Sequence, residues 1–415
     1  MNLNALGKSD APRQVKGLYS LWTGDGMNDL KRAEKVAWHI ESSLESSNAR
    51  VNQRLGCEAD LVESLGTGVG VVREALEILD LKGICVVQRG PGGGVFVARP
   101  CEAMTAQVLV NYLLRSGITG LDLQEAEVFM VSIAHKPDCM ENPAIQLFAE
   151  CLRQLKECLP KVSGARLSAD GHFCLTRPLS DIAFFNWKNY SGTRLSVAKK
   201  IGWEISQMIA NGRYAQRRIG SEEELCNEYG VSRASMRKAV RLMEAMGVIE
   251  CRPGRGLGLF VSAPNRVPVV RVLNSYLLGV RLSEQHWRSA IQIFGSASLM
   301  SLMADQGNRY DSLIETSIQS LDKKPVLAQL DRSRVILKST VEMCGNGIFR
   351  LFWLGMAGYT FRTARAEKIM STSDYGVLPE CVLDMLGAIL SRNQTLAIGS
   401  YQYIFTNEGR YQVVL

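Results

Sequence analysis

The chain has 415 residues, of which 46% are hydrophobic and 21% charged, and its formal net charge is +7. This length predicts two to four domains with sizeable cores, and the mildly basic balance permits a polyanionic partner. Because the sequence contains no run of eighteen apolar residues and no signal-peptide pattern, we expect a cytoplasmic protein with no membrane partner.

Residues 1–28 are polar and contain glycine, so they are predicted to form a flexible tail. Residues 29–100 follow as a first domain that reads as a helix, two further helices joined by a tight turn, and a glycine-rich hairpin. Helical spacing continues over residues 101–160 and predicts a partial helical region. Residues 161–194 place Pro, Gly and Ser between short apolar pieces, a composition that predicts a linker.

The same order of elements restarts after the predicted linker and occupies residues 195–263. A constant offset of 164 (230 − 66) relates Gly66 to Gly230 and Arg73 to Arg237, and it holds as far as Phe96 and Phe260 at the end of the hairpin. Such sustained register predicts an internal duplication. Residues 268–410 then carry apolar residues three or four apart and predict a helical bundle.

The second copy holds the clearest local signals. Ser221 and Glu224 have the spacing of a capping box, which predicts a helix over 222–229. Gly230 supplies a turn with positive φ, and Ser232 can cap the next helix. Together with the hairpin, this order predicts a winged helix-turn-helix. The expected fold is therefore mainly α, with two winged helix-turn-helix domains, each followed by an α-helical bundle region, the first of them truncated.

One face of the second predicted helix carries hydroxyl and basic side chains, which suits the major groove of double-stranded DNA. Arginine can contact guanine O6 and N7 together, and wing glycines let the backbone approach phosphates. Residues 195–262 contain eleven basic and seven acidic side chains, a net +4. The predicted DNA-binding set is Ser221, Ser232, Arg233, Ser235, Arg237, Lys238, Arg241, Arg252, Arg255 and Gly256.

The first copy has lost most of this chemistry. Gly68-Val69-Gly70-Val71 replaces Ser232-Arg233-Ala234-Ser235, and residues 30–99 contain nine basic and nine acidic side chains, a net charge of zero. We therefore predict a degenerate recognition helix that lacks the electrostatic footprint of DNA binding. Weak contact through Arg73, Arg89 and Gly92 stays open as an alternative.

These residues resemble the GntR family of bacterial transcription regulators, and within it the FadR-like branch. Segments 219–225, 230–233, 236–240 and 254–256 carry the resemblance. It implies that Gly256 enters the minor groove and that the residues contacting DNA include Ser232, Arg233, Ser235 and Arg237. It also implies a nucleoid-associated regulator that acts as a repressor rather than as an activator. Glu223 stands where the family has a contacting arginine, so the usual operator is not expected.

The bundle also resembles the family's effector domain, around Leu337 to Phe349. Many relatives bind a metal there through histidines, but the matching positions are Leu337, Val382 and Ile404, so we expect neither a metal nor any other cofactor. Two readings stay open, a small-molecule effector in an apolar pocket or a filled core. The tandem arrangement is likewise open between a pseudo-dimer in one chain and a homodimer.

Two other functional classes have less support in the sequence. The four histidines are dispersed, and the eleven cysteines occur singly, which favours reduced and mostly buried thiols. Because no acid partner or oxyanion loop can be assigned to His172 and Cys174, an enzyme is not expected. The alternative to an effector-controlled regulator is an architectural or plasmid-maintenance DNA-binding protein without an effector.

Overall fold

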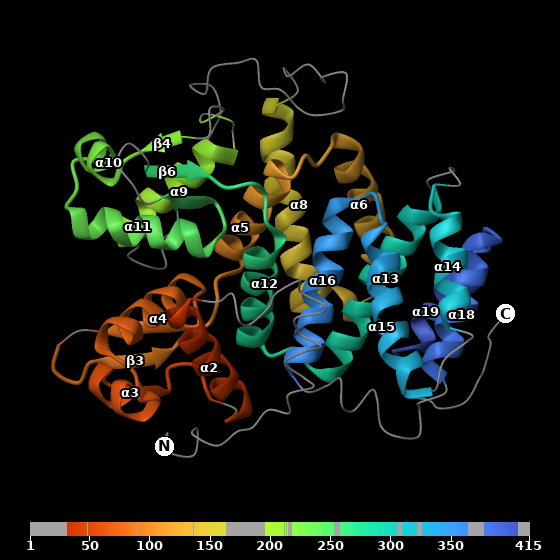
Figure 1. The fold of residues 1–415 in the computed structure, drawn as a ribbon, viewed down its shortest axis with the longest axis horizontal. Coiled ribbons are helices and arrows are strands. Elements are labelled where there is room, and N and C mark those ends of the chain that lie inside the picture. Colours follow the sequence, from red (N-terminus) through yellow and green to blue (C-terminus); the bar gives the residue numbers. More distant parts are fainter. Residues whose placement is uncertain are drawn as a thin grey trace. The chain divides into compact units, whose positions relative to one another are not determined.

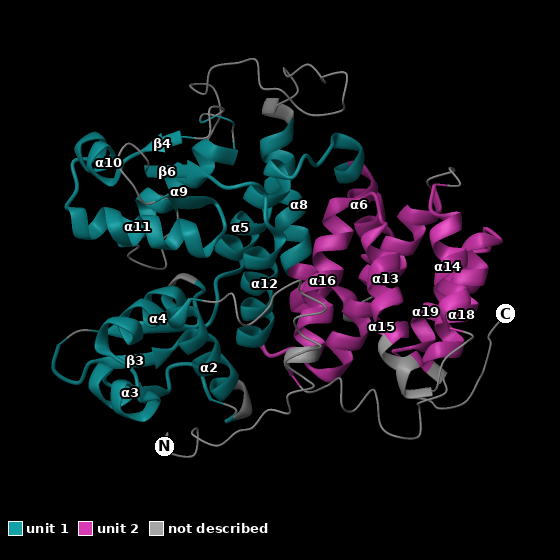
Figure 2. Ribbon diagram, in the orientation of Figure 1, with its two compact units in different colours: residues 1–9, 30–123, 147–280 teal, residues 10–29, 124–146, 281–415 magenta. Residues whose placement is uncertain are grey.

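The computed structural model describes residues 31–47, 49–88, 90–135, 137–162, 196–210, 212, 214, 218–252, 258–304, 309–321, 326–363 and 377–405. The predicted tail at 1–28, nearly all of the predicted linker at 161–194, and Arg89, His172, Arg255 and Gly256 lie outside these ranges. The chain is mainly helical, as predicted (Figure 1). It divides into two compact units (Figure 2), with described residues 31–123 and 147–280 in unit 1 and 124–146 and 281–405 in unit 2.

Unit 1 contains two modules with the same order of elements. The first module comprises α2 (Arg32–Ser46), β1 (Arg54–Gly56), α3 (Glu58–Leu65), α4 (Val69–Leu81), β2 (Cys85–Gln88) and β3 (Gly94–Val97). The second comprises α9 (Val197–Ala210), β4 (Arg218–Gly220), α10 (Glu222–Tyr229), α11 (Arg233–Ala245), β5 (Ile249–Arg252) and β6 (Gly258–Val261).

Each module has a three-stranded antiparallel sheet with the last strand in the middle, in the orders β1-β3-β2 and β4-β6-β5. The pairing register is the same, since Val86 lies opposite Phe96 in one sheet and Glu250 opposite Phe260 in the other. The hairpins β2–β3 and β5–β6 were predicted. The three-residue strands β1 and β4 were not, because so short a run carries no period-two pattern.

Two further helices of unit 1 follow the modules, α5 (Glu102–Arg115) after the first and α12 (Arg266–Val280) after the second. They pack on each other and each reaches the module to which it is not directly joined. Val108 of α5 is part of the core around α9 and α11. In the opposite direction, Ser275 of α12 donates hydrogen bonds to Glu41 of α2, at 3.1 and 3.2 Å to its two carboxylate oxygens.

A second set of contacts holds α5 and α12 against the modules to which they are not directly joined. Arg115 of α5 donates to the carbonyl oxygens of Gly247, Val248 and Ser262, at 3.3, 3.4 and 2.5 Å. Burial lowers the pKa of Arg115 to about 10. At the counterpart position in α12, Gly279 packs so closely on Pro100 that an added methyl group would lie 2.3 Å from the ring. The two modules are therefore interlocked through α5 and α12.

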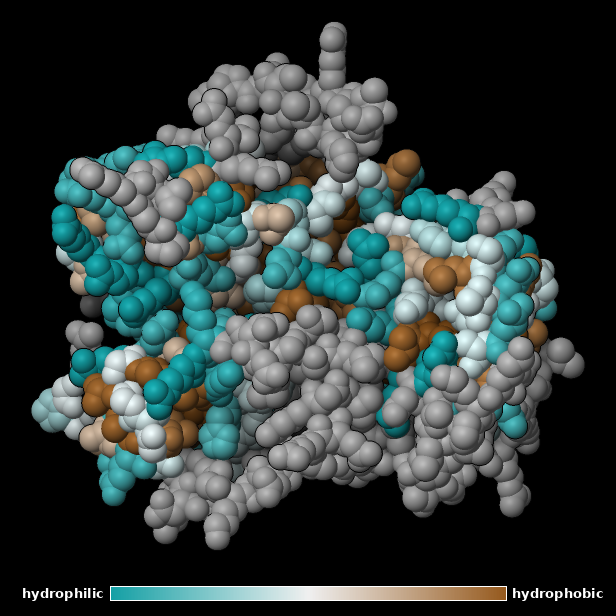
Figure 3. All heavy atoms as spheres, viewed as in Figure 1, coloured by the Kyte–Doolittle hydropathy of each residue, from teal (hydrophilic) through white to brown (hydrophobic). Residues whose placement is uncertain are grey.

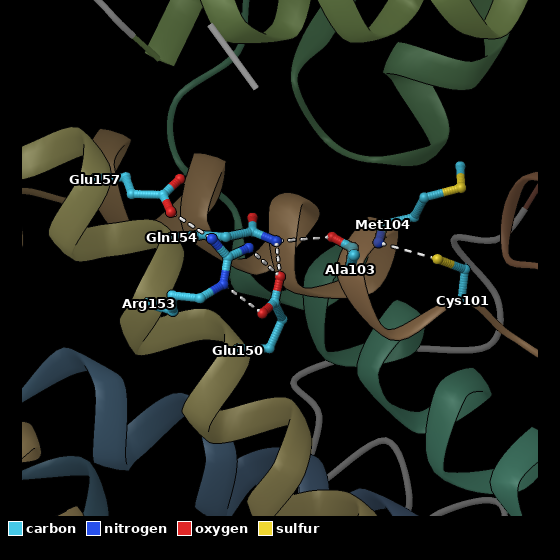
Figure 4. A network of polar contacts seen from close by, with 7 residues as sticks. All are labelled: Cys101, Ala103, Met104, Glu150, Arg153, Gln154 and Glu157. Carbon is cyan, nitrogen blue, oxygen red and sulfur yellow. Dashed lines mark hydrogen bonds and ion pairs between the residues drawn. The ribbon is translucent and has the colours of Figure 1, made fainter. Parts of the chain in front are cut away.

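The rest of the first copy consists of α6 (Gly120–Ile133), α7 (Pro137–Met140) and α8 (Pro143–Val162). Figure 4 shows how the α8 side chains join the start of α5: Gln154 Nε2 donates to Ala103 O at 3.1 Å and to Glu150 Oε1 at 2.7 Å. Arg153 forms ion pairs with Glu150 and Glu157 on the same helix. This network ties α8 to α5.

In the part of the chain that the structure describes, seven helices make up the region of the predicted bundle. They are α12 itself and, in unit 2, α13 (Glu284–Ala304), α14 (Asp311–Leu321), α15 (Val326–Glu342), α16 (Gly347–Arg362), α18 (Val377–Leu390) and α19 (Gln394–Tyr403). The core of unit 2 buries Trp287, Phe294, Trp353 and Tyr401. Tyr401 accepts a hydrogen bond from Trp353 Nε1 at 2.7 Å and donates to Ile291 O at 2.8 Å. No described helix is both long and apolar enough to cross a membrane.

Candidate nucleic-acid interface

The start of α10 is fixed by the predicted capping box. Ser221 Oγ accepts from the Glu224 backbone N–H at 3.1 Å, and Glu224 Oε2 accepts from the Ser221 N–H at 2.8 Å. The bond from the Ser221 N–H, together with nearby Arg218, holds the pKa of Glu224 below its usual value. Two of the N–H groups that a helix start leaves without intrahelical partners are thereby satisfied.

The turn into α11 also follows the prediction. Gly230 adopts the left-handed conformation, with φ of 61°, and ends α10. Ser232 is the N-cap of α11, because its Oγ accepts from the Ser235 N–H at 3.2 Å, and the two hydroxyl oxygens lie 3.0 Å apart. The free N–H groups of this helix start and the two hydroxyls face the same end of α11, an arrangement that suits an anion such as a phosphate.

α11 buries one face and exposes the other. Met236, Val240 and Met243 are buried in the core of the second module, where Leu225 and the partly buried Tyr229 and Val231 join them, as predicted. Ser232, Arg233, Arg237, Lys238 and Arg241 are exposed. The hydrophobic spacing therefore sets which side of α11 the basic residues occupy.

The first two arginines of α11 are paired with the first turn of α10. Arg233 lies 3.4 Å from Glu223 Oε1, and Arg237 Nε lies 3.6 Å from Glu222 Oε2. Both guanidinium groups stay well exposed, with side chains 72% and 58% accessible. These glutamates were not predicted as partners, although their position in the first turn of the helix before a recognition-type helix was a usable signal. The pairs orient the arginines while leaving them within reach of a ligand.

The later basic residues of α11 lie against the first module. Lys238 Nζ is 2.7 Å from Glu77 Oε1 of α4. Arg241 borders a cavity whose lining also includes Glu74 and Glu77 of α4 and Glu244 of α11. Two of the four predicted basic residues of α11, Lys238 and Arg241, therefore lie near carboxylates of the first module. No local sequence pattern predicts this arrangement.

The hairpin of the second module presents one described arginine. Arg252 Nε donates to Glu250 Oε1 at 2.7 Å, and its guanidinium carbon lies 4.4 Å from the centre of the Phe260 ring. The cation–π contact and the ion pair hold this side chain beside the predicted wing. Arg255 and Gly256, the remaining predicted wing residues, lie outside the described residues.

The corresponding face of the first module is chemically different. Arg73 forms an ion pair with Glu58, the counterpart of the pair between Arg237 and Glu222. The N-cap of α4 is Gly68, which offers no side-chain hydrogen bond. Val69 is 46% exposed where the second module has Arg233. Gly92 is exposed in the hairpin turn, with φ of 76°, and Arg89 lies outside the described ranges.

The surface reflects this difference. In Figure 3 the face over α10 and α11 is mostly hydrophilic, whereas the face over α3, α4 and β3 includes a hydrophobic patch. Val86 and Val87 of β2 are 36% and 47% exposed, and their counterparts in β5 are Glu250 and Cys251. An apolar surface of this kind provides neither charge nor hydrogen bonds to a phosphate backbone.

Unit 2 contains the three positions at which histidines would hold a metal, namely Leu337, Val382 and Ile404. Leu337 and Val382 are buried there, and Ile404 ends α19. Asn346 caps α16 by accepting from the Ile348 N–H at 2.9 Å, and its Nδ2 donates to Glu125 Oε2, also at 2.9 Å. Among the described residues, no group of three or more His, Cys, Asp or Glu side chains is placed to hold a metal ion.

The second module is similar to a known protein family. Residues 197–259 match the family described as bacterial regulatory proteins, gntR family. A curated relative, "Putative HTH-type transcriptional regulator RmpR" of Mycobacterium gastri, is 31% identical over 148 residues, which are 35% of this chain and 53% of the relative. The chain therefore spans about half the length of that relative.

A solved structure of Lar, which controls the expression of the Listeria monocytogenes agr system and mediates virulence, aligns with 51% of this chain and 94% of its own. The identity is 15% and the TM-score is 0.24. The family match covers α9, β4, α10, α11, β5 and the start of β6. Residues 197–259 are therefore a helix-turn-helix domain of the gntR family of bacterial regulatory proteins.

Proposed function

We propose that the protein is a sequence-specific transcriptional regulator, acting as a repressor, and that α11 of the second module reads double-stranded DNA. The observation that carries the proposal is the exposed start of α11, where Ser232, Arg233 and Arg237 project from a helix whose opposite face is buried. Recognition helices insert this part into the major groove. The family match over residues 197–259 supports the same assignment.

We infer that the first module is a second winged helix-turn-helix produced by duplication. Its support is the spacing of the elements: from β1 and β4 (218 − 54) to α6 and α13 (284 − 120), counterparts begin 164 residues apart. This module would act as a scaffold for the second, with Arg73 and Gly92 as its candidate weak contacts. The interlocked α5 and α12 favour a pseudo-dimer within one chain.

The bundle of unit 2 would supply control. It contains a polar cluster of the partly buried Glu125 with Ser301 and Asn346, in which Ser301 Oγ lies 3.2 Å and Asn346 Nδ2 2.9 Å from Glu125 Oε2. We propose that a small-molecule effector acts through this bundle. A change in DNA affinity on adding a small molecule distinguishes such a regulator from an architectural protein without an effector.

The test begins with genomic DNA fragments that the full chain retains against excess non-specific competitor. Sequencing these fragments gives the operator, and Arg233→Ala and Arg237→Ala are then measured on it by a mobility or anisotropy titration. Each loss is expected to be about 1–3 kcal/mol, the discrimination that a base-contacting arginine provides. The proposal fails if the retained fragments share no motif and both variants bind them as tightly as the parent chain.

A further inference from the structure

The basic side chains of α11 differ in where their carboxylate partners come from. Arg233 and Arg237 are paired with Glu223 and Glu222, which belong to the same module. Lys238 is paired with Glu77, which belongs to the first module. Glu222 and Glu223 belong to the same module as α11 and therefore move with it when it approaches a ligand. Glu77 belongs to the first module, so its ion pair holds Lys238 in place relative to that module.

Neighbouring contacts keep α4 beside α11. Lys199 Nζ of α9 lies 2.8 Å from Asp80 Oδ2 and 3.1 Å from the Asp80 carbonyl oxygen, at the end of α4. On the other side, Lys31 Nζ lies 3.3 Å from Glu244 Oε2 of α11. The side chain of Glu77 is 27% exposed, so water screens its pair with Lys238 less than it screens the pair between Arg233 and Glu223.

We propose that Glu77 of the first module is a specificity-determining residue for the second: by holding Lys238, it withdraws one cation from sequence-independent contact with DNA phosphates. The inference rests on the proposed function, since it presumes that α11 binds DNA. Each lysine that neutralises a phosphate adds to non-specific affinity through counterion release. Base readout by Arg233 and Arg237 does not need that contact, so the pairing lowers non-specific binding more than specific binding.

The degenerate first module thereby acquires a role that does not require it to touch DNA. Its α4 has lost the capping serine and the first arginine of a recognition helix, yet it keeps Glu77 at 2.7 Å from Lys238. The counterpart of Glu77 in α11 is Arg241 (77 + 164), which borders the same cavity. The charge inversion at equivalent positions makes the two helices complementary where they meet.

The experiment compares the full chain with Glu77→Gln, Lys238→Gln and the double variant, on the selected operator and on random-sequence duplex, over a range of salt concentrations. Glu77→Gln should bind random duplex about twofold to fivefold more tightly at low salt, the range expected of a partly exposed ion pair. The slope of log affinity against log salt should steepen by about 0.9, one added phosphate contact. Operator affinity should change less, so the ratio of specific to non-specific affinity falls.

The double-mutant cycle separates this account from a general charge effect. In the Lys238→Gln background, Glu77→Gln should leave random-duplex affinity and the salt slope unchanged, because the released cation is absent. Glu63→Gln, which neutralises an exposed glutamate of α3, serves as the matched charge control and should have little effect. Thermal unfolding of each variant checks that the fold is retained.

An effect of Glu77→Gln that persists without Lys238, or that Glu63→Gln reproduces, overturns the proposal. So does an unchanged salt slope in a folded Glu77→Gln chain that still prefers the operator. Failure of the proposed function looks different: Arg233→Ala would bind the operator as tightly as the parent chain, whatever the behaviour of Glu77→Gln.

Discussion

A buried ion pair at the junction of α2, α4 and α12 gives the sharpest stability prediction. Glu41 Oε1 lies 2.7 Å from Lys82 Nζ, with side chains 1% and 12% exposed, and Ser275 donates to both Glu41 oxygens. Lys82→Met removes the cation that lies 2.7 Å from this buried carboxylate. Breaking a buried pair from one side costs about 3–5 kcal/mol.

The second module buries uncharged side chains at the equivalent positions. Its counterparts are Ser206 (41 + 165), following the register of α2 and α9, and Met246 (82 + 164), and both are buried. We therefore expect Glu41→Gln combined with Lys82→Met to recover most of the lost stability, because no buried charge remains and Ser275 keeps an acceptor. Urea denaturation gives the magnitude, and hydrogen exchange of peptides from α2 assigns it to unit 1.

The pH dependence of Lys82→Met provides a second check. Loss of a nearby cation raises the pKa of a buried carboxyl, because burial already disfavours its charged form. The folded state of this variant then binds more protons than the unfolded state, so its deficit in unfolding free energy should be largest near neutral pH and shrink as the pH falls. A double variant as unstable as Lys82→Met alone, or a deficit that does not depend on pH, would refute the reasoning.

Three further changes test other parts of unit 1. Arg115→Ala leaves three carbonyl groups without their charged donor and should lower the free energy of unfolding by about 2–3 kcal/mol in urea denaturation. Burial raises the pKa of Glu102, so Glu102→Gln should melt above the parent near neutral pH and lose this advantage in acid, where the parent carboxyl is protonated. Ser232→Ala removes the α11 cap and should cost about 0.5–2 kcal/mol, measured as faster amide exchange in its first turn.

Local chemistry explains why much of the fold could be predicted. Ser221, Glu224 and Gly230 satisfy or terminate a helix by themselves, and the predicted helix at 222–229 has the same bounds as α10. Asn346 and Asn393 act in the same local way, because each caps the helix that follows it. These signals depend on residues within four positions of each other, so a single sequence contains them.

The packing of α5 and α12, each against the module that it does not directly follow, could not be predicted. It depends on pairs of residues far apart in the chain. Arg115 meets the carbonyl of Gly247 across 132 positions, and neither residue has a pattern that points to the other. At the candidate site, the hydrophobic spacing of α11 placed Arg233 and Arg237 on the exposed face. The ion pair between Lys238 and Glu77 could not be predicted for the same reason, since only the packing of the two modules brings Glu77 to Lys238.

We propose that α11, and not its counterpart α4, carries sequence recognition. The most direct measurement compares Arg233→Ala with Val69→Ala, at equivalent positions in the two modules, on the selected operator and on random duplex at matched salt. We expect Arg233→Ala to lose about 1–3 kcal/mol on the operator alone, and Val69→Ala to bind both duplexes as the parent chain does. Equal losses from the two variants would contradict the account.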